Sequence, residues 1–400
     1  MRTPTLIILT LAVSHASHLS ADEEQTFRTD HSTDETRTWY QLVDGEFPPE
    51  GSAHYFSGEL TKVDHLNRAF VLRIDRTDKQ NRSHFDLPVA ITMLPYGAIY
   101  YNGAPAALQD IPLGTHLHGL FYAKHPDDET KRLEGWYNRV SIEADFTRCV
   151  RIEDDFSFYA RQNQHWRIDD YDREQNKLTA TLMQQDHAVG EPAVFDVLDS
   201  TRVWQDNGIG TLKDIAAGQL VQFNITWATL YGAGRILELW IDDASRQLAT
   251  SHQLERHRQH IRERGLPAMV NTVDNQQRLV TVTFFDSVDQ SLFEELAIVN
   301  NEPLGWPIKH EPASTNTAKA TLAVARHTLM TYDPVNDRKG GPVRELRRVP
   351  RAFGSAGVEA TIECSVLLEG FRPNRIVRVY PSHWKVIALP KEEEFFGLDE

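Results

Sequence analysis

Two histidines separated by one residue are the strongest candidates for chemistry in this chain. His116 and His118 flank Leu117 in a β-type segment that follows Gly114. Side chains two apart on a strand share a face, so the two imidazoles are presented together. A divalent metal site would still need a third or fourth ligand beside this pair, and His125 is the nearest candidate. The alternative is that both rings lie on the solvated face of a half-exposed strand while Leu117 points into the core.

A second group of titratable residues follows a helical pattern. His257, His260 and Glu263 recur at three-residue steps, which keeps neighbours within reach of one another. His257 also shares its face with Leu254 and Ile261. This pattern favours packing of His257 in a core over metal binding.

Two pairs of adjacent aspartates, Asp154-Asp155 and Asp242-Asp243, are the acidic candidates. Neighbouring residues of a strand point to opposite faces, so we expect turn and strand-end roles rather than paired acid–base carboxylates. The sequence contains no G-x-S-x-G, H-E-x-x-H, P-loop or G-x-G-x-x-G motif. We therefore predict no catalytic residue and no cofactor, with a divalent metal at the histidine pair as the alternative.

Aromatic residues suggest a second mode of ligand binding. Tyr96, Tyr100 and Tyr101 lie in one β-type run, Trp136 precedes another, and Trp306 lies in a long insertion, residues 286–318. Aromatic rings on the face of a small barrel can stack on sugars or bases. The alternative is that the tyrosines and Trp136 fill barrel cores and that Trp306 covers the edge of a strand.

Bulk properties restrict the partners. The formal charge of −15 argues against a nucleic-acid partner, because such binding needs a concentrated basic surface. An unknown protein or a polysaccharide is the expected partner.

The N-terminus predicts export. Residues 1–21 contain Arg2, an apolar run and then small residues, which is the pattern of a signal peptide for secretion or transfer to the periplasm. The run is too short to span a bilayer, and no later stretch approaches the roughly 20 apolar residues of a transmembrane helix. An oxidising compartment permits Cys149 and Cys364 to pair, and two buried thiols are the alternative.

The elements that must position these residues recur three times. Each repeat has an Asp-centred hairpin, at Asp64, Asp172 or Asp274, and a later six-residue step that starts at Leu. The steps end at Gly114, Gly218 and Asn374, and the first two contain Asp110 and Asp214. Glycine and asparagine adopt positive φ most readily, so all three steps predict the same tight turn into the fourth strand of a barrel.

Alternation and turn signals predict a mainly β fold of three tandem five-stranded OB-like barrels. The predicted boundaries are a signal peptide (1–21), a disordered or loosely docked acidic leader (22–50), barrel 1 (51–147), barrel 2 (148–243), a bridging helix (244–265) and barrel 3 with its insertion (266–400). Only one helix is predicted, Ala244 to Arg264. Gly265 and Pro267 mark its C-terminal end.

The Leu-x-Asp-Ile-x-x-Gly step of the first two repeats resembles a signature of small exported bacterial OB-like domains of unknown function. That resemblance implies a fold and carries over no functional residue. We expect an exported, non-enzymatic binding or scaffolding protein. The alternatives are a metal-binding or metal-dependent protein that uses His116 and His118, and an enzyme whose site forms between barrels without a local motif.

Overall fold

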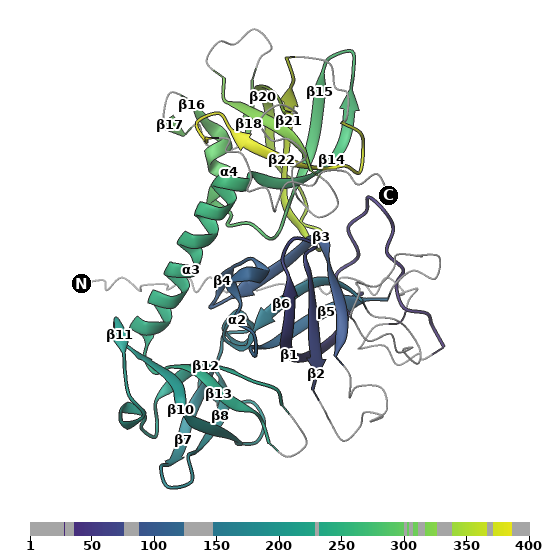
Figure 1. The fold of residues 1–400 in the computed structure, drawn as a ribbon. Coiled ribbons are helices and arrows are strands. Elements are labelled where there is room, and N and C mark those ends of the chain that lie inside the picture. Colours follow the sequence, from purple (N-terminus) through teal and green to yellow (C-terminus); the bar gives the residue numbers. More distant parts are fainter. Residues whose placement is uncertain are drawn as a thin grey trace, which may run out of the picture.

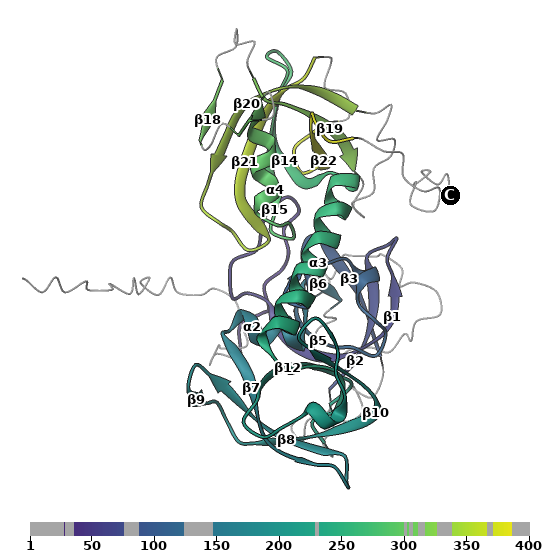
Figure 2. The ribbon, with the colours of Figure 1, turned by 90° about the vertical axis from the view of Figure 1, so that its left-hand side faces the viewer.

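The computed structural model describes residues 28, 36–75, 88–123, 147–228, 232–299, 302–303, 307–310, 317–325, 338–365 and 371–385. This part of the chain is mainly β and forms three closed barrels, as predicted. Helix α3 (Asp243–Arg264) runs from barrel 2, past barrel 1, to barrel 3 (Figures 1 and 2).

Barrel 1 contains β1 (His54–Asp64), β2 (Ala69–Ile74), β3 (Val89–Tyr101), β5 (His116–Tyr122) and β6 (Arg148–Asp154), with the short β4 (Ala104–Pro105) beside β3. The ring runs β1-β2-β3-β6-β5, and β3 and β6 are its one parallel pair among the described strands. This is the connectivity of an OB-like barrel. Because β6 pairs with β3 and β5, barrel 1 extends to Asp154, and the boundary predicted at residue 147 is wrong.

Barrel 2 repeats this ring with β7 (Gln164–Asp172), β8 (Lys177–Gln184), β10 (Ala193–Gln205), β12 (Leu220–Ile225) and β13 (Arg235–Trp240). Strands β10 and β13 form the parallel pair. The short strands β9 (His187–Ala188) and β11 (Gly208–Ile209) extend β8 and β10 as hairpins. The two barrels therefore have the same topology.

Barrel 3 departs from the predicted template. Its ring has six strands, β14 (Leu266–Asp274), β15 (Leu279–Phe285), β21 (Ser355–Glu363), β20 (Arg338–Arg348), β19 (Lys319–Ala325) and β22 (Ile376–Pro381), in that spatial order. The chain between β15 and β21 supplies β19 and β20, which close the barrel. Strand β19 occupies the position beside β22. Smaller elements of this region are α4 (Ser291–Glu294), β16 (Ile298–Val299), β17 (Glu302–Pro303) and β18 (Ile308–Lys309).

The three predicted turns share one backbone arrangement. Gly114, Gly218 and Asn374 have φ angles of 91°, 86° and 68°, which are positive as predicted. The N–H group of each donates, over 2.7 to 2.9 Å, to a carbonyl of the first strand of its barrel, at Leu60, Ile168 or Val270. The preceding 3-10 helices η1 (Leu108–Asp110) and η2 (Leu212–Asp214) are capped by the Asp110 and Asp214 carboxylates, which accept from Ala107 N and Thr211 N.

Two helices connect the barrels. The short α2 (Asp155–Arg161), a helix not predicted from the sequence, joins barrels 1 and 2. Helix α3 bonds to barrel 1 through Thr250 Oγ1 and the Asn102 carbonyl (2.8 Å), and to barrel 3 through Arg258 and Asp289 (2.6 Å). Within the described residues, no helix is long and apolar enough to cross a membrane.

The described part of the predicted leader, residues 36–50, is docked rather than disordered. The ring of Phe47 lies 5.2 Å from that of Tyr96 and 6.2 Å from that of Phe285, in a core shared by barrels 1 and 3. Apolar residues in this stretch bury enough surface to order it, so of the two alternatives the docked one holds for residues 36–50. Cys149 and Cys364 are free thiols, buried in the cores of barrels 1 and 3.

Candidate functional site between the first two barrels

Strand β5 places His116 and His118 on the side of barrel 1 that faces α2 and barrel 2. Leu117, between them, is fully buried in the barrel core, as predicted. The His116 and His118 side chains are only 5% and 7% exposed. The alternative of a solvated histidine face is therefore wrong, because α2 and barrel 2 cover this face of barrel 1.

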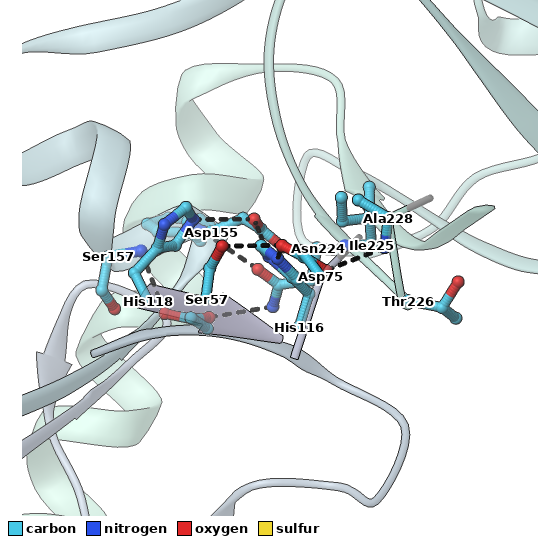
Figure 3. Close-up of polar contacts among 12 residues, drawn as sticks. Ser57, Asp75, His116, His118, Asp155, Ser157, Asn224, Ile225, Thr226 and Ala228 are labelled. Carbon is cyan, nitrogen blue, oxygen red and sulfur yellow. Dashed lines mark hydrogen bonds and ion pairs between the residues drawn. The ribbon is translucent and has the colours of Figure 1, made fainter. Parts of the chain in front are cut away.

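His116 lies between two carboxylates (Figure 3). Its Nδ1 is 2.7 Å from Asp155 Oδ1, and its Nε2 is 2.7 Å from Asp75 Oδ2. Asp75 follows β2, and its Oδ2 also accepts from the Ser57 hydroxyl at 2.6 Å. Since carboxylates only accept hydrogen bonds, both ring nitrogens of His116 donate.

His118 shares Asp155 with His116. Its Nε2 donates to Asp155 Oδ1 at 3.0 Å, and its Nδ1 lies 2.7 Å from the hydroxyl of Tyr55. The ring of Phe158, on α2, stacks on the His118 ring with 3.7 Å between centroids. We call Tyr55, Ser57, Asp75, His116, His118 and Asp155 the histidine–aspartate network.

Barrel 2 binds both carboxylates of the network through its backbone. The Ile225 N–H donates to Asp155 Oδ2 at 3.0 Å, and the Ala228 N–H donates to Asp75 Oδ1 at 3.1 Å. The Trp227 indole N–H donates to the Ile74 carbonyl at 2.9 Å. The network therefore joins the two barrels as well as the two histidines.

The neighbouring Asp154 forms a second link. Its carboxylate caps α2 by accepting from Ser157 N (3.0 Å), and it also accepts from Asn102 N (3.0 Å) and Asn224 Nδ2 (2.8 Å). Burial raises the pKa of Asp154 to about 6 against these hydrogen bonds. Asp154 thus connects the β3–β4 turn of barrel 1, α2 and β12 of barrel 2.

The charge states within the network follow from burial and from neighbouring charges. Burial disfavours a charged His116, but Asp155 and Asp75 outweigh it and raise the His116 pKa to about 10. Burial would raise the pKa of Asp155, yet the adjacent histidines hold that pKa well below its usual range. Burial lowers the pKa of His118. A charged His116 and a neutral His118 therefore fit the observed donors and acceptors.

The same atoms form a candidate metal site. One ligand atom each from His116, His118 and Asp155 lie within 4.8 Å of one another. Asp75 and Tyr55 hold the other nitrogens of the two rings, as outer-shell partners commonly do in metal sites. The third predicted ligand, His125, lies outside the described residues.

The predicted aromatic platform does not form on the three tyrosines. Tyr96 and Tyr101 are 8% and 6% exposed, and the half-buried Tyr100 is covered by the Arg151 guanidinium, 4.8 Å from its ring centroid. Tyr101 donates to Glu238 of barrel 2 at 3.1 Å. A stacking platform needs an exposed ring face, whereas Tyr96 lies in the core shared with barrel 3 and Tyr101 in the core of barrel 1. Trp136 and Trp306 lie outside the described residues.

Asp75 and Asp155 were not predicted as site residues. Adjacent strand aspartates point to opposite faces, but Asp155 is the first residue of a helix. The local signal for this helix start is Asp154 itself, since aspartate is a favoured N-cap residue. Nothing local indicates that Asp75 meets His116, since 41 residues separate them. The prediction that His257 packs in a core is confirmed, because it is 3% exposed.

Comparisons with known proteins add no assignment to this geometry. No family model matches the chain, and no curated protein is significantly similar to it in sequence.

Proposed function

We propose that this protein is an exported, non-enzymatic scaffolding or binding protein that holds three OB-like barrels in one fixed arrangement. The observation that carries the proposal is that all four ring nitrogens of His116 and His118 bond to protein oxygens within a buried junction. The groups best suited to chemistry are thus occupied in joining two barrels. The signal-like N-terminus and the resemblance of the first two repeats to exported domains support the location.

Contacts between the other barrels support a fixed arrangement. Helix α3 pairs Arg262 with Glu295 of barrel 3 at 2.8 Å, and Gln253 with Asp110 of barrel 1 at 3.1 Å. Barrels 1 and 3 share an apolar core that includes Leu94, Met269 and Phe285. Each barrel therefore contacts the other two or the helix that joins them.

Small-angle scattering and unfolding of the full chain test this proposal. The scattering curve should fit one relative placement of the three barrels. Unfolding in urea, followed by tryptophan fluorescence and by circular dichroism, should give coincident single transitions. Separate transitions, or scattering that requires a range of distances between barrels, would overturn the proposal.

The second candidate function is metal binding, and the three clustered ligand atoms favour it. With His116 charged, the network holds one imidazolium and two carboxylates, so its net charge is −1. A Zn²⁺ ion that replaced the proton on His116 Nδ1 would make the cluster neutral. The ligand atoms would have to separate, because two ligands at about 2.1 Å from one tetrahedral zinc lie farther apart than the present 2.7 Å.

Metal analysis decides between these candidates. A metal protein should retain about one ion per chain after purification without chelators. After EDTA treatment it should bind one Zn²⁺ in titration calorimetry, and His118→Gln should abolish this binding. His187→Gln changes an exposed histidine of β9 and is the matched control. Absence of zinc binding by the treated wild type rejects the metal candidate.

A further inference from the structure

Residues 40–50 cross the junction between barrels 1 and 3, and we call this segment the strap. In Figure 2 it is the purple ribbon that reaches the level of β15. Its Tyr40 ring lies 5.9 Å from the Tyr122 ring of barrel 1, and its Phe47 ring lies 6.2 Å from the Phe285 ring of barrel 3. The strap therefore contacts both barrels through aromatic side chains.

The strap lies in a groove that fits its sequence. Gly45 has a φ of 82°, and a Cβ atom at this position would overlap the side chain of Asn374, in the turn before β22. The half-buried Phe47 and the buried Pro48 follow. Beneath them lie buried side chains of both barrels: Leu94, Tyr96, Val150, Met269, Phe285 and Ile376. The groove therefore already holds an extended peptide with an aromatic residue next to proline.

Packing alone attaches most of the strap. The described backbone hydrogen bonds of residues 41–50 are local, since Glu46 N donates to the Val43 carbonyl and the Pro49 carbonyl accepts from Ser52 N. Within the described residues, no hydrogen bond or ion pair joins residues 41–50 to a strand of either barrel. Segments with few hydrogen bonds to the core open at a lower free-energy cost than core strands do.

A hinge follows the strap. Gly51 is exposed, has a φ of 75° and has no atom within 4 Å of an added Cβ. The next residue, Ser52, is 1% exposed, and its hydroxyl lies 2.8 Å from that of Tyr122. Barrel 1 is thus anchored at Ser52, while the backbone can rotate at Gly51. The strap can therefore detach without disrupting a strand.

We infer that the strap is releasable and that its groove binds, in its place, an extended peptide with an aromatic residue next to proline. Detachment uncovers the apolar side chains beneath Phe47, and such a peptide from a partner protein covers them again. Aromatic grooves are typical sites for extended proline-containing peptides. The inference rests on the proposed function, because the groove exists only while barrels 1 and 3 keep one relative placement.

A fluorescein-labelled peptide of residues 40–50 tests the inference on the full chain by fluorescence anisotropy. The wild type should bind it weakly, because its own strap competes for the groove. Gly45→Val should bind it about tenfold more tightly, because the added side chain overlaps Asn374 and keeps the strap out of the groove. A labelled peptide that carries Phe47→Ala should bind to neither protein.

Gly190→Val is the matched control. Gly190, in the loop before β10 of barrel 2, has a φ of 95° and no atom within 4 Å of an added Cβ. The variant introduces similar backbone strain outside the groove and should bind the peptide as the wild type does. Phe47→Ala is the second strap variant. It removes the ring without strain at positive φ and should also bind the peptide more tightly than the wild type, and circular dichroism checks the fold of each variant.

Two results would overturn the inference: the folded strap variants do not bind the peptide, or they bind it no more tightly than the wild type does. If Gly45→Val does not fold, Phe47→Ala decides. If either result occurs while scattering of the wild type fits one placement of the barrels, the releasable strap fails and the scaffold survives. If scattering instead shows independent barrels, the proposed function itself fails.

Discussion

The two places where the chain leaves an OB-like barrel begin with the same two residues and differ in what those residues do. Asp154 and Asp242 each end a barrel and cap the following helix, by accepting from Ser157 N at 3.0 Å and Ser245 N at 2.7 Å. The next residues differ: the Asp155 side chain is 2% exposed, whereas the Asp243 side chain is 84% exposed and pairs only with Arg246 among the described residues.

The strand opposite each aspartate explains the difference. Counting from the matched glycines Gly114 and Gly218, His116 corresponds to Leu220, which is 44% exposed. Barrel 2 packs over His116 in barrel 1, whereas the equivalent face of β12 lies beside an open cleft lined by Leu220 and Asp243. The cap is thus common to both exits, and burial by a neighbouring barrel makes the second aspartate part of a network.

The largest expected effect distinguishes the two second aspartates. All partners of the Asp155 carboxylate are donors, so the NH₂ group of the side chain introduced by Asp155→Asn would face another donor, either the Ile225 N–H or the histidines. The variant also leaves the charged His116 with Asp75 as its one carboxylate. Breaking one side of a buried ion pair costs about 3–5 kcal/mol of unfolding free energy. Asp243→Asn should change it by less than about 0.5 kcal/mol, as exposed substitutions do. Urea unfolding measures the change in unfolding free energy for both variants. Equal changes would show that burial by barrel 2 does not distinguish Asp155 from Asp243.

A pH effect should mark the helix of the second exit. His257 Nε2 accepts from the Asp289 N–H at 3.2 Å, and burial, assisted by His260, lowers the His257 pKa to about 4. Unfolded histidine has a pKa of about 6.5, so between these values the unfolded chain binds more protons. Neutral His257 makes its full contribution to the free energy of unfolding above pH 6.5. This contribution is lost as the pH falls toward 4, and about 2 kcal/mol of it is lost at pH 5.

The test compares unfolding free energies at pH 7 and pH 5. His257→Gln should show a smaller decrease than the wild type, whereas His187→Gln, at an exposed site, should keep the wild-type decrease. If His257→Gln loses as much stability on acidification as the wild type, His257 is not the titrating group.

A smaller and equal effect is expected where the two barrels are alike. Gly114→Ala and Gly218→Ala each force a side chain into positive φ, at a cost of about 1–2 kcal/mol. No atom lies within 3.4 Å of the added Cβ at either site, so steric clashes do not distinguish them. Gly208→Ala, where φ is not positive and no atom lies within 4 Å, is the control and should be neutral. Thermal unfolding that differs strongly between the first two variants would show that the turns are not equivalent.

The smallest effect concerns a histidine placed in barrel 2 at the position of His116. Leu220→His should change stability by less than about 0.5 kcal/mol, because the site is half-exposed. NMR titration should give a pKa no higher than the ordinary value of about 6.5, since Arg246, which donates to the Leu220 carbonyl, is a neighbouring cation. A clearly raised pKa would mean that this position alone, without a covering barrel, creates the network.

Features that depend on near neighbours could be predicted from the sequence. The Asp-centred hairpins and the positive φ at Gly114, Gly218 and Asn374 depend on short-range backbone chemistry. The pairing of His116 with His118 on one face follows from strand periodicity alone. The single long helix had enough turns to show a periodic pattern.

The features that could not be predicted from the sequence depend on contacts between distant segments. Asp155 lies in a seven-residue helix, which is too short to produce a clear period, and Asp75 reaches His116 only after β1, β2 and β5 have paired. Barrel 3 is closed by β19 and β20, which follow the predicted insertion (286–318) and precede β21, so no strand pattern near its C-terminal end could indicate the closing pair. The docking of Phe47 requires a surface that exists only when barrels 1 and 3 are in contact.

The length of α3 sets both a distance and a rotation. Its 22 residues span about 33 Å, and each residue turns the helix by about 100°. Deleting one residue between Gln253, which bonds to barrel 1, and Arg258, which bonds to barrel 3, would rotate barrel 3 by nearly a third of a circle relative to barrel 1. Homologous chains that keep the three-barrel arrangement should therefore conserve the number of residues in this helix more strictly than their identity.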